Sequence, residues 1–361
     1  TIPAMASTND YFLIIIALQI SIIFMTKTCN CSTILIFGDS TVDTGNNNYI
    51  MTLFKGNFYP YGKDFPGKIP TGRFSNGKLV PDFVASMLGI KQLVPPFLDP
   101  SLSHDELLTG VSFASAGSGF DALTTLVSKV IPVFNQIGMF RDYIKKLKET
   151  VGDQKAREII NNALVVISAG TNDFVFNFYD LPTRRFEYTI SGYQDFLLDR
   201  LQSFVKELYE LGIRKMAIAG LPPIGCLPIQ MTAKFEHPLK RKCLEDQNSD
   251  SQSYNRKLEK LLNQMETLLP KSTIVYADIY EALIDMIHHP QKYGFVETKR
   301  GCCGTGLAEA SFLCNPATPI CKNHSEFLFW DSIHPSQSTY QHLAENLTFS
   351  VLQKLLHNNT R

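Results

Sequence analysis

Three side chains of this sequence have the types and the spacing that nucleophilic catalysis requires. A serine hydroxyl is a weak nucleophile until a base removes its proton, and the base needs a partner that holds its ring and tautomer. Asp331 lies three residues before His334, a spacing that one helical turn or a tight loop brings onto one face. Ser40 stands directly after Gly38 and Asp39. We predict that Ser40 is the nucleophile, His334 the base and Asp331 its orienting partner.

Attack of a hydroxyl on an ester carbonyl also creates an oxyanion that needs hydrogen-bond donors. Each preorganised donor is worth about 10² to 10³ in rate. Two further polar segments, 114–117 (ASAG) and 170–173 (GTND), follow apolar runs elsewhere in the chain. We predict that the backbone amides of Ser40 and Gly117 and the side-chain amide of Asn172 form the oxyanion hole. A glycine at position 117 lets the backbone approach the reacting centre, because it has no Cβ.

Strands that alternate with helices are predicted to position these residues. Four short apolar runs rich in β-branched residues indicate buried strands, at 33–37, 163–168, 215–219 and 273–276. A weaker strand is expected at 109–113. Amphipathic helical patterns lie at 134–147, 193–211 and 254–269. This alternation predicts a parallel sheet covered on both faces, and the polar segments converge at the carboxyl ends of its strands, where such sheets bind ligands.

The composition is that of a globular protein without a strong electrostatic field. The chain has 361 residues, of which 44% are hydrophobic and 19% charged, and its 34 basic residues balance 34 acidic ones. Such a chain buries a substantial core. A net charge of zero does not attract nucleic acid or an anionic membrane surface, so neither is an expected partner, and the composition carries no signal of oligomeric state.

The N-terminal segment has the profile of a signal peptide. Residues 11–25 are almost wholly apolar and uncharged, and residues 27–32 are small and polar. An apolar run of 15 residues is too short for a hydrocarbon core that needs roughly 20, so no stable membrane insertion is expected. We expect residues 1–31, with Met5 as the start, to be a signal peptide and residues 32–361 to form a single secreted domain, extracellular or in the cell wall. No Lys or Arg precedes the run, which departs from the signal-peptide pattern and leaves an uncleaved anchor as the less favoured alternative.

Eight cysteines fit an oxidising compartment. Zinc binding is less favoured, because Cys302 and Cys303 are adjacent and no Cys-x-x-Cys pair is present. We expect disulfides within 302–321 and a separate bridge between Cys226 and Cys243. The disulfide candidates are Cys226, Cys243, Cys302, Cys303, Cys314 and Cys321. Candidate glycosylation sites are Asn323, Asn346 and Asn358, with Asn30 added if it survives cleavage.

The joint order of these segments closely resembles the plant GDSL esterase/lipase family of the SGNH-hydrolase superfamily, from about residue 34 to 352. The matching blocks are 37–47 (FGDSTVDTGNN), 113–119 (FASAGSG), 170–173 (GTND) and 329–335 (FWDSIHP). Thr41 replaces the leucine that gives the family its name. Segments 70–77 (PTGRFSNG) and 221–226 (LPPIGC) are also similar to the family, without an evident catalytic role.

The resemblance implies the same roles for the same residues. Ser40 is the nucleophile and an oxyanion donor, and Asp331 and His334 complete the triad. Gly117 is the second donor, with Gly119 as an alternative register. Asn172 is the third donor. The implied fold is α/β: a three-layer α/β/α, flavodoxin-like SGNH-hydrolase fold with a central parallel sheet of about five strands.

The leading functional hypothesis is a secreted serine esterase or lipase that hydrolyses carboxylic esters through an acyl-Ser40 intermediate, without cofactor or metal. One alternative is acyl transfer to another alcohol by the same triad. Another is a non-catalytic secreted binding protein on the same fold, although binding alone gives no reason to retain all the catalytic residues. The acyl ester is the expected partner.

Two segments are candidates for contact with the acyl group. An aromatic cluster follows Asn172 directly and either lines an acyl pocket or packs in the core; its members are Phe174, Phe176, Phe178 and Tyr179. The segment 49–58 is a weak candidate for a lid or an exposed apolar surface.

Overall fold

The computed structural model of the chain describes residues 31–234 and 241–357. The expected signal peptide up to residue 30 and the sequon at Asn358 lie outside the described residues. No helix within the described ranges is both long enough and apolar enough to cross a membrane.

Four parallel strands form the central sheet. They are β1 (Ile34–Gly38), β2 (Leu164–Ser168), β3 (Lys215–Ala219) and β4 (Thr273–Ala277), in the spatial order β1-β2-β3-β4. Each strand agrees with its predicted range to within one residue. The near-continuous apolar runs suit this position, because a parallel sheet covered on both faces is buried on both.

The fifth strand predicted at 109–113 is reduced to an extended segment beside β1. The amide of Ile36 donates to the carbonyl of Val111 at 3.1 Å, and the amide of Phe113 donates to the carbonyl of Ile36 at 2.7 Å. The ladder is short because Gly110 has a φ of 99°, outside the β region, and a Cβ there would lie 1.9 Å from the carbonyl oxygen of Ile34. If β1, this segment, β2, β3 and β4 are numbered 1 to 5 along the chain, their order across the sheet is 2-1-3-4-5. This is the flavodoxin-like order.

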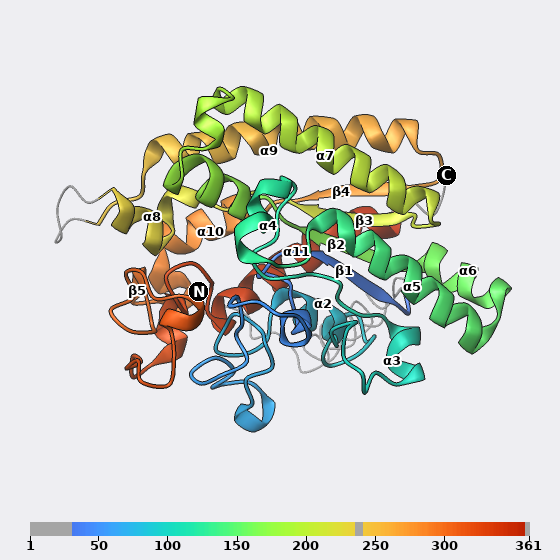
Figure 1. The fold of residues 1–361 in the computed structure, drawn as a ribbon, viewed down its shortest axis with the longest axis horizontal. Helices are drawn as coiled ribbons and strands as arrows, with labels where there is room; N and C mark the ends of the chain where they lie inside the picture. The colour runs from blue at the N-terminus through green and yellow to red at the C-terminus, as the bar shows by residue number, and fades with distance from the viewer. Residues whose placement is uncertain (1–30, 235–240, 358–361) are drawn as a thin grey trace, which may run out of the picture.

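Helices cover both faces of the sheet and complete the three-layer α/β/α fold (Figure 1). One layer contains α5 (Val133–Val151), α7 (Ile190–Glu210) and α9 (Glu245–Leu268), which contain or overlap the three predicted helical patterns. The other layer contains α2 (Val80–Met87), α10 (Ile279–His288) and α11 (Gln337–His357); α11 packs against α2, α10 and β4. The shorter helices are α3 (His104–Thr109), α4 (Ala122–Ser128), α6 (Asp153–Asn162) and α8 (Pro228–Ala233).

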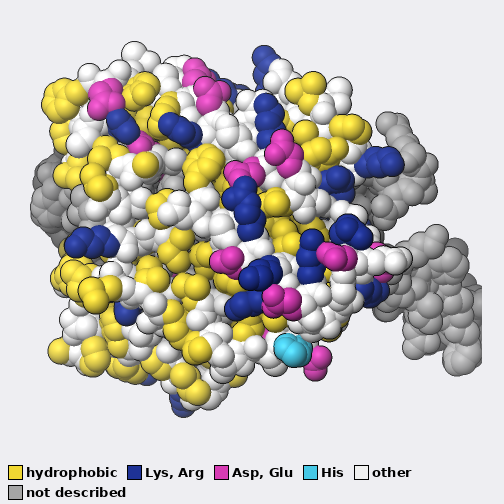
Figure 2. All heavy atoms as spheres, turned by 45° about the vertical axis from the view of Figure 1, so that its right-hand side comes forward, with side chains coloured by type: hydrophobic (Ala, Val, Ile, Leu, Met, Phe, Trp, Pro, Cys, Tyr) yellow, Lys and Arg dark blue, Asp and Glu magenta, His cyan; other side chains and the backbone are white. Residues whose placement is uncertain are grey.

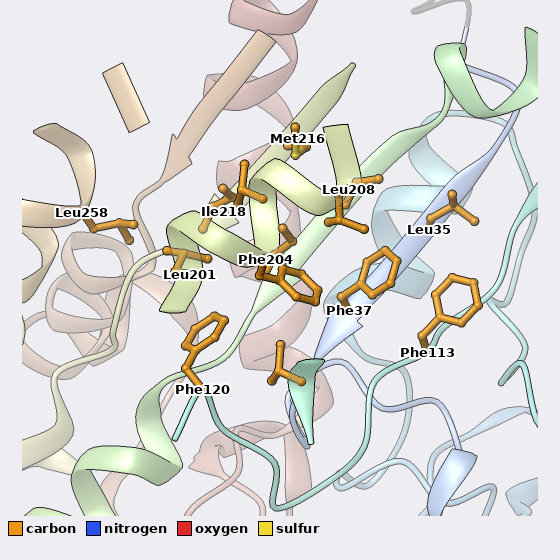
Figure 3. Close-up of a cluster of buried hydrophobic side chains, with 14 of the residues drawn as sticks. Leu35, Phe37, Phe113, Phe120, Leu201, Phe204, Leu208, Met216, Ile218 and Leu258 are labelled. Atoms are coloured by element: carbon orange, nitrogen blue, oxygen red, sulfur yellow. The ribbon is translucent and has the colours of Figure 1, made fainter. Parts of the chain in front are cut away.

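The larger part of the core lies between the sheet and the layer of α5, α7 and α9 (Figure 3). Phe37 of β1 stacks on Phe113 with ring centroids 4.8 Å apart, and meets Phe204 of α7 edge-on at 5.6 Å. Met216 and Ile218 of β3 point into this cluster. Since successive side chains of a strand alternate between faces, the residues between and beyond them face α11.

Three disulfides join the predicted cysteines: Cys226 to Cys243, Cys302 to Cys321 and Cys303 to Cys314. This confirms the expected bridges within 302–321 and the separate bridge between Cys226 and Cys243. The six cysteines are therefore oxidised and cannot serve as thiolate ligands of zinc. The 302–321 loop joins β5 (Glu297–Gly301) to β6 (Phe327–Phe329), which pair in parallel as a small second sheet. Asp331 follows β6 by two residues.

Charged side chains of both signs are interspersed on the face shown in Figure 2. Lys and Arg lie beside Asp and Glu there, separated by apolar and uncharged atoms. This distribution matches the equal numbers of acidic and basic residues in the sequence.

Candidate active site

Ser40 lies in the loop after β1, where the flavodoxin-like order switches direction between β1 and β2. Gly38 ends the strand at a φ of 141°, and a Cβ there would lie 1.9 Å from the carbonyl oxygen of Ser168. The side chain of Gln136 in α5 holds this turn in place. Its amide oxygen accepts from the amide of Gly38, and its amide nitrogen donates to the carbonyl of Gly38, both at 2.8 Å. The turn therefore requires glycine and presents Ser40 at the strand end.

Thr41 stabilises the same loop, although it replaces the family's leucine. Its hydroxyl lies 2.8 Å from Oδ1 of Asp39 and 2.9 Å from the hydroxyl of Ser168. The substitution thus links the Ser40 loop to the end of β2. Burial raises the pKa of Asp39 to about 6.

The three residues predicted as a triad lie in one hydrogen-bonded chain. Nε2 of His334 is 2.8 Å from Oγ of Ser40, and Nδ1 of His334 is 2.7 Å from Oδ2 of Asp331. Oδ1 of Asp331 also accepts the backbone amides of Ile333 at 2.9 Å and His334 at 2.7 Å. One fully buried carboxylate therefore fixes both the loop that carries the imidazole and the orientation of its ring.

Tyr61 is a member of this site that sequence reasoning missed. Its hydroxyl donates to Oδ2 of Asp331 at 2.7 Å and accepts the amide of Ser311 at 2.8 Å. Burial and the neighbouring carboxylate raise the pKa of Tyr61 well above its usual range, so the hydroxyl stays protonated as a donor. No local signal marks this residue, since it lies 270 positions from Asp331 in the chain.

Phe74, within the 70–77 segment, lies beside the imidazole of His334. Its ring lies 4.8 Å from the imidazole of His334, centroid to centroid, and it is almost completely buried. The neighbouring Arg73 forms a buried, two-pronged ion pair with Asp82 of α2, with both contacts at 2.8 Å. A bidentate pair of this kind is a rigid link, so the segment holds the ring of Phe74 against one side of the His334 imidazole.

The proposed oxyanion donors come from three strand ends that are linked to one another. Nδ2 of Asn172 donates to the carbonyl of Ser118 at 2.9 Å, which orients the amide and leaves its second N–H for another acceptor. The hydroxyl of Ser118 donates to the carbonyl of Gly38 at 2.8 Å. The 114–119 loop is thereby held against both Asn172 and the turn before Ser40.

Gly117 and Gly119 have different surroundings, so different constraints require a glycine at each position. Gly117 has a φ of 85°, and a Cβ there would lie 3.0 Å from the ring of Phe54. At Gly119 a Cβ would lie only 2.1 Å from Oδ1 of Asp173, so packing against a buried carboxylate explains that glycine. This difference favours Gly117 over Gly119 as the residue whose backbone faces the reacting centre.

Two more buried carboxylates hold the loops around the site. Asp43 accepts the amides of Gly45 and Asn46 at 2.8 Å and of Ala116 at 2.9 Å, and burial raises its pKa to about 6. Asp173 accepts two backbone amides of the 120–121 turn and the hydroxyl of Thr124, and burial raises its pKa to about 7. These carboxylates organise backbone and do not touch the triad.

The aromatic cluster after Asn172 divides between two environments. Phe174 and Phe178 lie in the π-helical segment η3 (Asp173–Asp180) and pack in the core against Tyr193, with ring centroids 5.8 and 5.6 Å apart. Phe176 instead meets Phe54 edge-on at 6.4 Å. The core alternative is therefore right for Phe174 and Phe178, and neither lines the cavity at Ser40.

The 49–58 segment exposes apolar side chains near the same region. Met51 is 95% exposed and Leu53 is 73% exposed, while Phe54 turns inward against Gly117. The hydroxyl of Ser311 donates to the carbonyl of Leu53 at 3.1 Å, which links this segment to the disulfide-bonded loop.

Comparison with known proteins places the chain in a family. The model of the GDSL-like Lipase/Acylhydrolase family matches residues 34–347. Similar curated proteins of Arabidopsis thaliana include GDSL esterase/lipase At2g30310, 61% identical over 86% of this chain and 87% of its own length, and At2g31550, 59% identical over 87% and 88%. A more distant one, At5g45960, is 50% identical over 88% and 85%. The chain therefore belongs to the GDSL esterase/lipase family of carboxylic ester hydrolases.

Proposed function

We propose that this protein is a secreted serine esterase that hydrolyses carboxylic esters through an acyl-Ser40 intermediate. The hydrogen-bonded chain from Ser40 through His334 to Asp331 carries the proposal, with its contacts of 2.8 and 2.7 Å. A buried serine, imidazole and carboxylate in this order are the groups that general-base activation of a hydroxyl needs.

In the first step His334 Nε2 takes the proton of Ser40 as Oγ attacks the carbonyl carbon. The oxyanion that forms accepts hydrogen bonds from the amides of Ser40 and Gly117 and from Nδ2 of Asn172. His334 then gives its proton to the departing alcohol, and the acyl group stays on Ser40. Asp331 stabilises the imidazolium throughout.

In the second step a water molecule attacks the acyl group of Ser40. His334 accepts the proton of this water, the carboxylic acid leaves, and the serine hydroxyl is restored. An alcohol in place of water makes the same chemistry an acyl transfer, so the transferase alternative differs only in the acceptor. A purely binding role gives no reason for a base placed against Ser40.

Secretion is supported by the three disulfides, because such bonds persist in oxidising compartments. Residues 1–31 act as the signal peptide, and residues 32–361 form one domain. Asn323 and Asn346 are exposed and accessible to glycosylation, as proposed also for Asn358; Asn346 lies within α11 rather than in a loop.

The test is hydrolysis of p-nitrophenyl butyrate by the Ser40→Ala variant. We expect kcat/KM to fall at least about 10³-fold with the melting temperature preserved, because the nucleophile is removed and the fold is not. Ser332→Ala is the matched control, since its buried hydroxyl has no hydrogen-bond partner in the described part of the chain. Retained activity in Ser40→Ala refutes the mechanism. Products formed in the presence of glycerol, free acid against new ester, distinguish hydrolase from transferase.

A further inference from the structure

The amide of Gly117, one of the three proposed oxyanion donors, belongs to the central peptide of a β-turn. The amide of Ser118 donates to the carbonyl of Ser115 at 3.1 Å and closes the turn around Ala116 and Gly117. Gly117 has a φ of 85° and Ala116 does not have a positive φ, which together fit a type II turn. The peptide that links Ala116 to Gly117 takes no part in the hydrogen bond of the turn itself.

The orientation of this central peptide decides where the N–H of Gly117 points. Turns of types I and II differ by a rotation of the central peptide through about 180°, and a glycine at the third position tolerates both. In a trans peptide the N–H points away from the C=O, so a group that binds the carbonyl of Ala116 also fixes the direction of the Gly117 N–H. Gly117 is buried, and its N–H has no acceptor among the residues that the structure describes.

The side chain of Asn47 binds the Ala116 carbonyl. Its Nδ2 donates one hydrogen to that carbonyl at 2.9 Å and the other to the carbonyl of Phe54 at 2.7 Å. Its Oδ1 accepts the hydroxyl of Ser115 at 2.5 Å. Asn47 is only 1% exposed, so both of its donors and its acceptor are committed to holding these backbone and side-chain groups in place.

The contacts around Ala116 explain why an asparagine is needed at position 47. Oδ2 of Asp43 accepts the amide of Ala116 at 2.9 Å, so the residue is held through its N–H on one side and through its C=O on the other. An aspartate at position 47 would offer no N–H, and a serine would offer a single donor. A hydrogen bond to a buried carbonyl also polarises the peptide, which makes the Gly117 N–H a stronger donor.

We infer that Asn47 is a positioning residue for the oxyanion hole. Its hydrogen bond to the Ala116 carbonyl holds the 116–117 peptide in the orientation that turns the Gly117 N–H toward the oxyanion. The inference rests on the proposed function, in which this N–H stabilises the tetrahedral intermediate. Because the oxyanion exists only after Ser40 has attacked, Asn47 affects the chemical step and leaves substrate binding almost unchanged.

The test is the hydrolysis of p-nitrophenyl butyrate by the Asn47→Ala variant. We expect kcat to fall about 10- to 100-fold, which is less than or comparable to the loss of one oxyanion donor. KM should stay within about threefold of the wild-type value. The pH profile of kcat/KM should keep its shape, because Asn47 has no hydrogen bond to Ser40, His334 or Asp331 in the described part of the chain.

Asn46→Ala is the matched control. Asn46 stands one position earlier, is equally buried, and also donates from Nδ2 to two carbonyls, those of Ser112 and Ala114, both at 2.8 Å. Neither carbonyl belongs to the 116–117 peptide. This variant should lose a similar amount of stability and keep kcat within about threefold. An equal loss of kcat in both variants overturns the inference, since the effect is then general loosening of the segment.

Propyl trifluoromethyl ketone probes the oxyanion hole directly. Oγ of Ser40 adds to its carbonyl carbon, the proton passes to His334, and the hemiketal oxygen carries the negative charge. The inhibition constant should rise in Asn47→Ala by the factor by which kcat/KM falls, and it should stay at the wild-type value in Asn46→Ala. An unchanged constant in Asn47→Ala overturns the inference.

Ser115→Ala is a milder variant for the case in which Asn47→Ala does not fold. It removes the hydroxyl that holds Oδ1 of Asn47 and keeps both donors of the Asn47 amide. We expect a smaller rise of the inhibition constant, by about threefold, with KM for the butyrate ester unchanged. An inhibition constant equal to that of the wild type contradicts the inference in this variant as well.

Comparison with Ser40→Ala separates this inference from the proposed function. Hydrolysis that depends on Ser40, together with full kcat in Asn47→Ala, leaves the esterase intact and refutes the role of Asn47. A wild-type protein without Ser40-dependent cleavage refutes the proposed function and this inference with it.

Discussion

The hydroxyl of Tyr61 donates a 2.7 Å hydrogen bond to Oδ2 of Asp331, the oxygen that also receives Nδ1 of His334. The hydroxyl is itself held by the amide of Ser311, inside the loop closed by the Cys303 to Cys314 disulfide. Tyr61 therefore positions the carboxylate that holds the imidazole of His334.

Replacing Tyr61 by phenylalanine should lower kcat about tenfold and leave KM within about twofold, because a buried carboxylate that loses a donor costs roughly 1–3 kcal/mol. The acid limb of the kcat/KM profile should move to higher pH, since a less satisfied Asp331 holds the imidazolium more strongly. Steady-state kinetics across pH measure both effects.

Tyr143→Phe is the matched control for this variant. Tyr143 is equally buried, and its hydroxyl donates to the carbonyl of Leu107 at 2.6 Å, away from the triad. It should lose stability without a change in the pH profile. An unshifted profile in Tyr61→Phe would limit Tyr61 to a structural role.

His334→Ala should abolish covalent labelling of Ser40 by an organophosphate, because the hydroxyl no longer has a base 2.8 Å away. His324→Ala is the control, since Nδ1 of His324 also pairs with a carboxylate, at 2.9 Å from Asp64, but its Nε2 has no hydrogen bond to a serine among the described residues. It should label like the wild type. Intact-mass spectrometry after a fixed incubation measures the labelled fraction, and undiminished labelling of His334→Ala excludes it as the base.

The sequence predicted the four strands to within one residue because they have local signatures, and the three residues predicted as a triad lie in one hydrogen-bonded chain. Short β-branched apolar runs mark buried parallel strands, and Ser40 comes shortly after one of them, whereas Asp331 and His334 are marked by their spacing of three residues. The weak strand at 109–113 was over-predicted, since its apolar pattern does not reveal that Gly110 leaves the β region.

Features that depend on distant packing were not predictable. Tyr61 meets Asp331 across 270 positions, and no pattern near either residue indicates the contact. The aromatic residues after Asn172 looked equally suited to a pocket and to the core, because periodicity does not tell which layer a π-helical segment faces.

Stability should fall as the pH rises from acidic to neutral. Burial raises the pKa of Asp39 and Asp43 to about 6 and that of Asp173 to about 7, from ordinary values of 3.8. Between pH 4 and 7 the folded protein therefore binds more protons than the unfolded chain. The free energy of unfolding then decreases with pH, since its slope follows the difference in bound protons.

We expect the melting temperature to be at least about 5 °C lower at pH 8 than at pH 5, because each pKa unit is worth about 1.4 kcal/mol. Calorimetry in buffers of matched ionic strength measures this difference. Asp173→Asn removes one of the raised carboxyl groups and should reduce the slope, whereas Asp105→Asn at an exposed position of α3 should not. A melting temperature that stays constant or rises over this range would mean that the backbone amides around these carboxylates outweigh their burial.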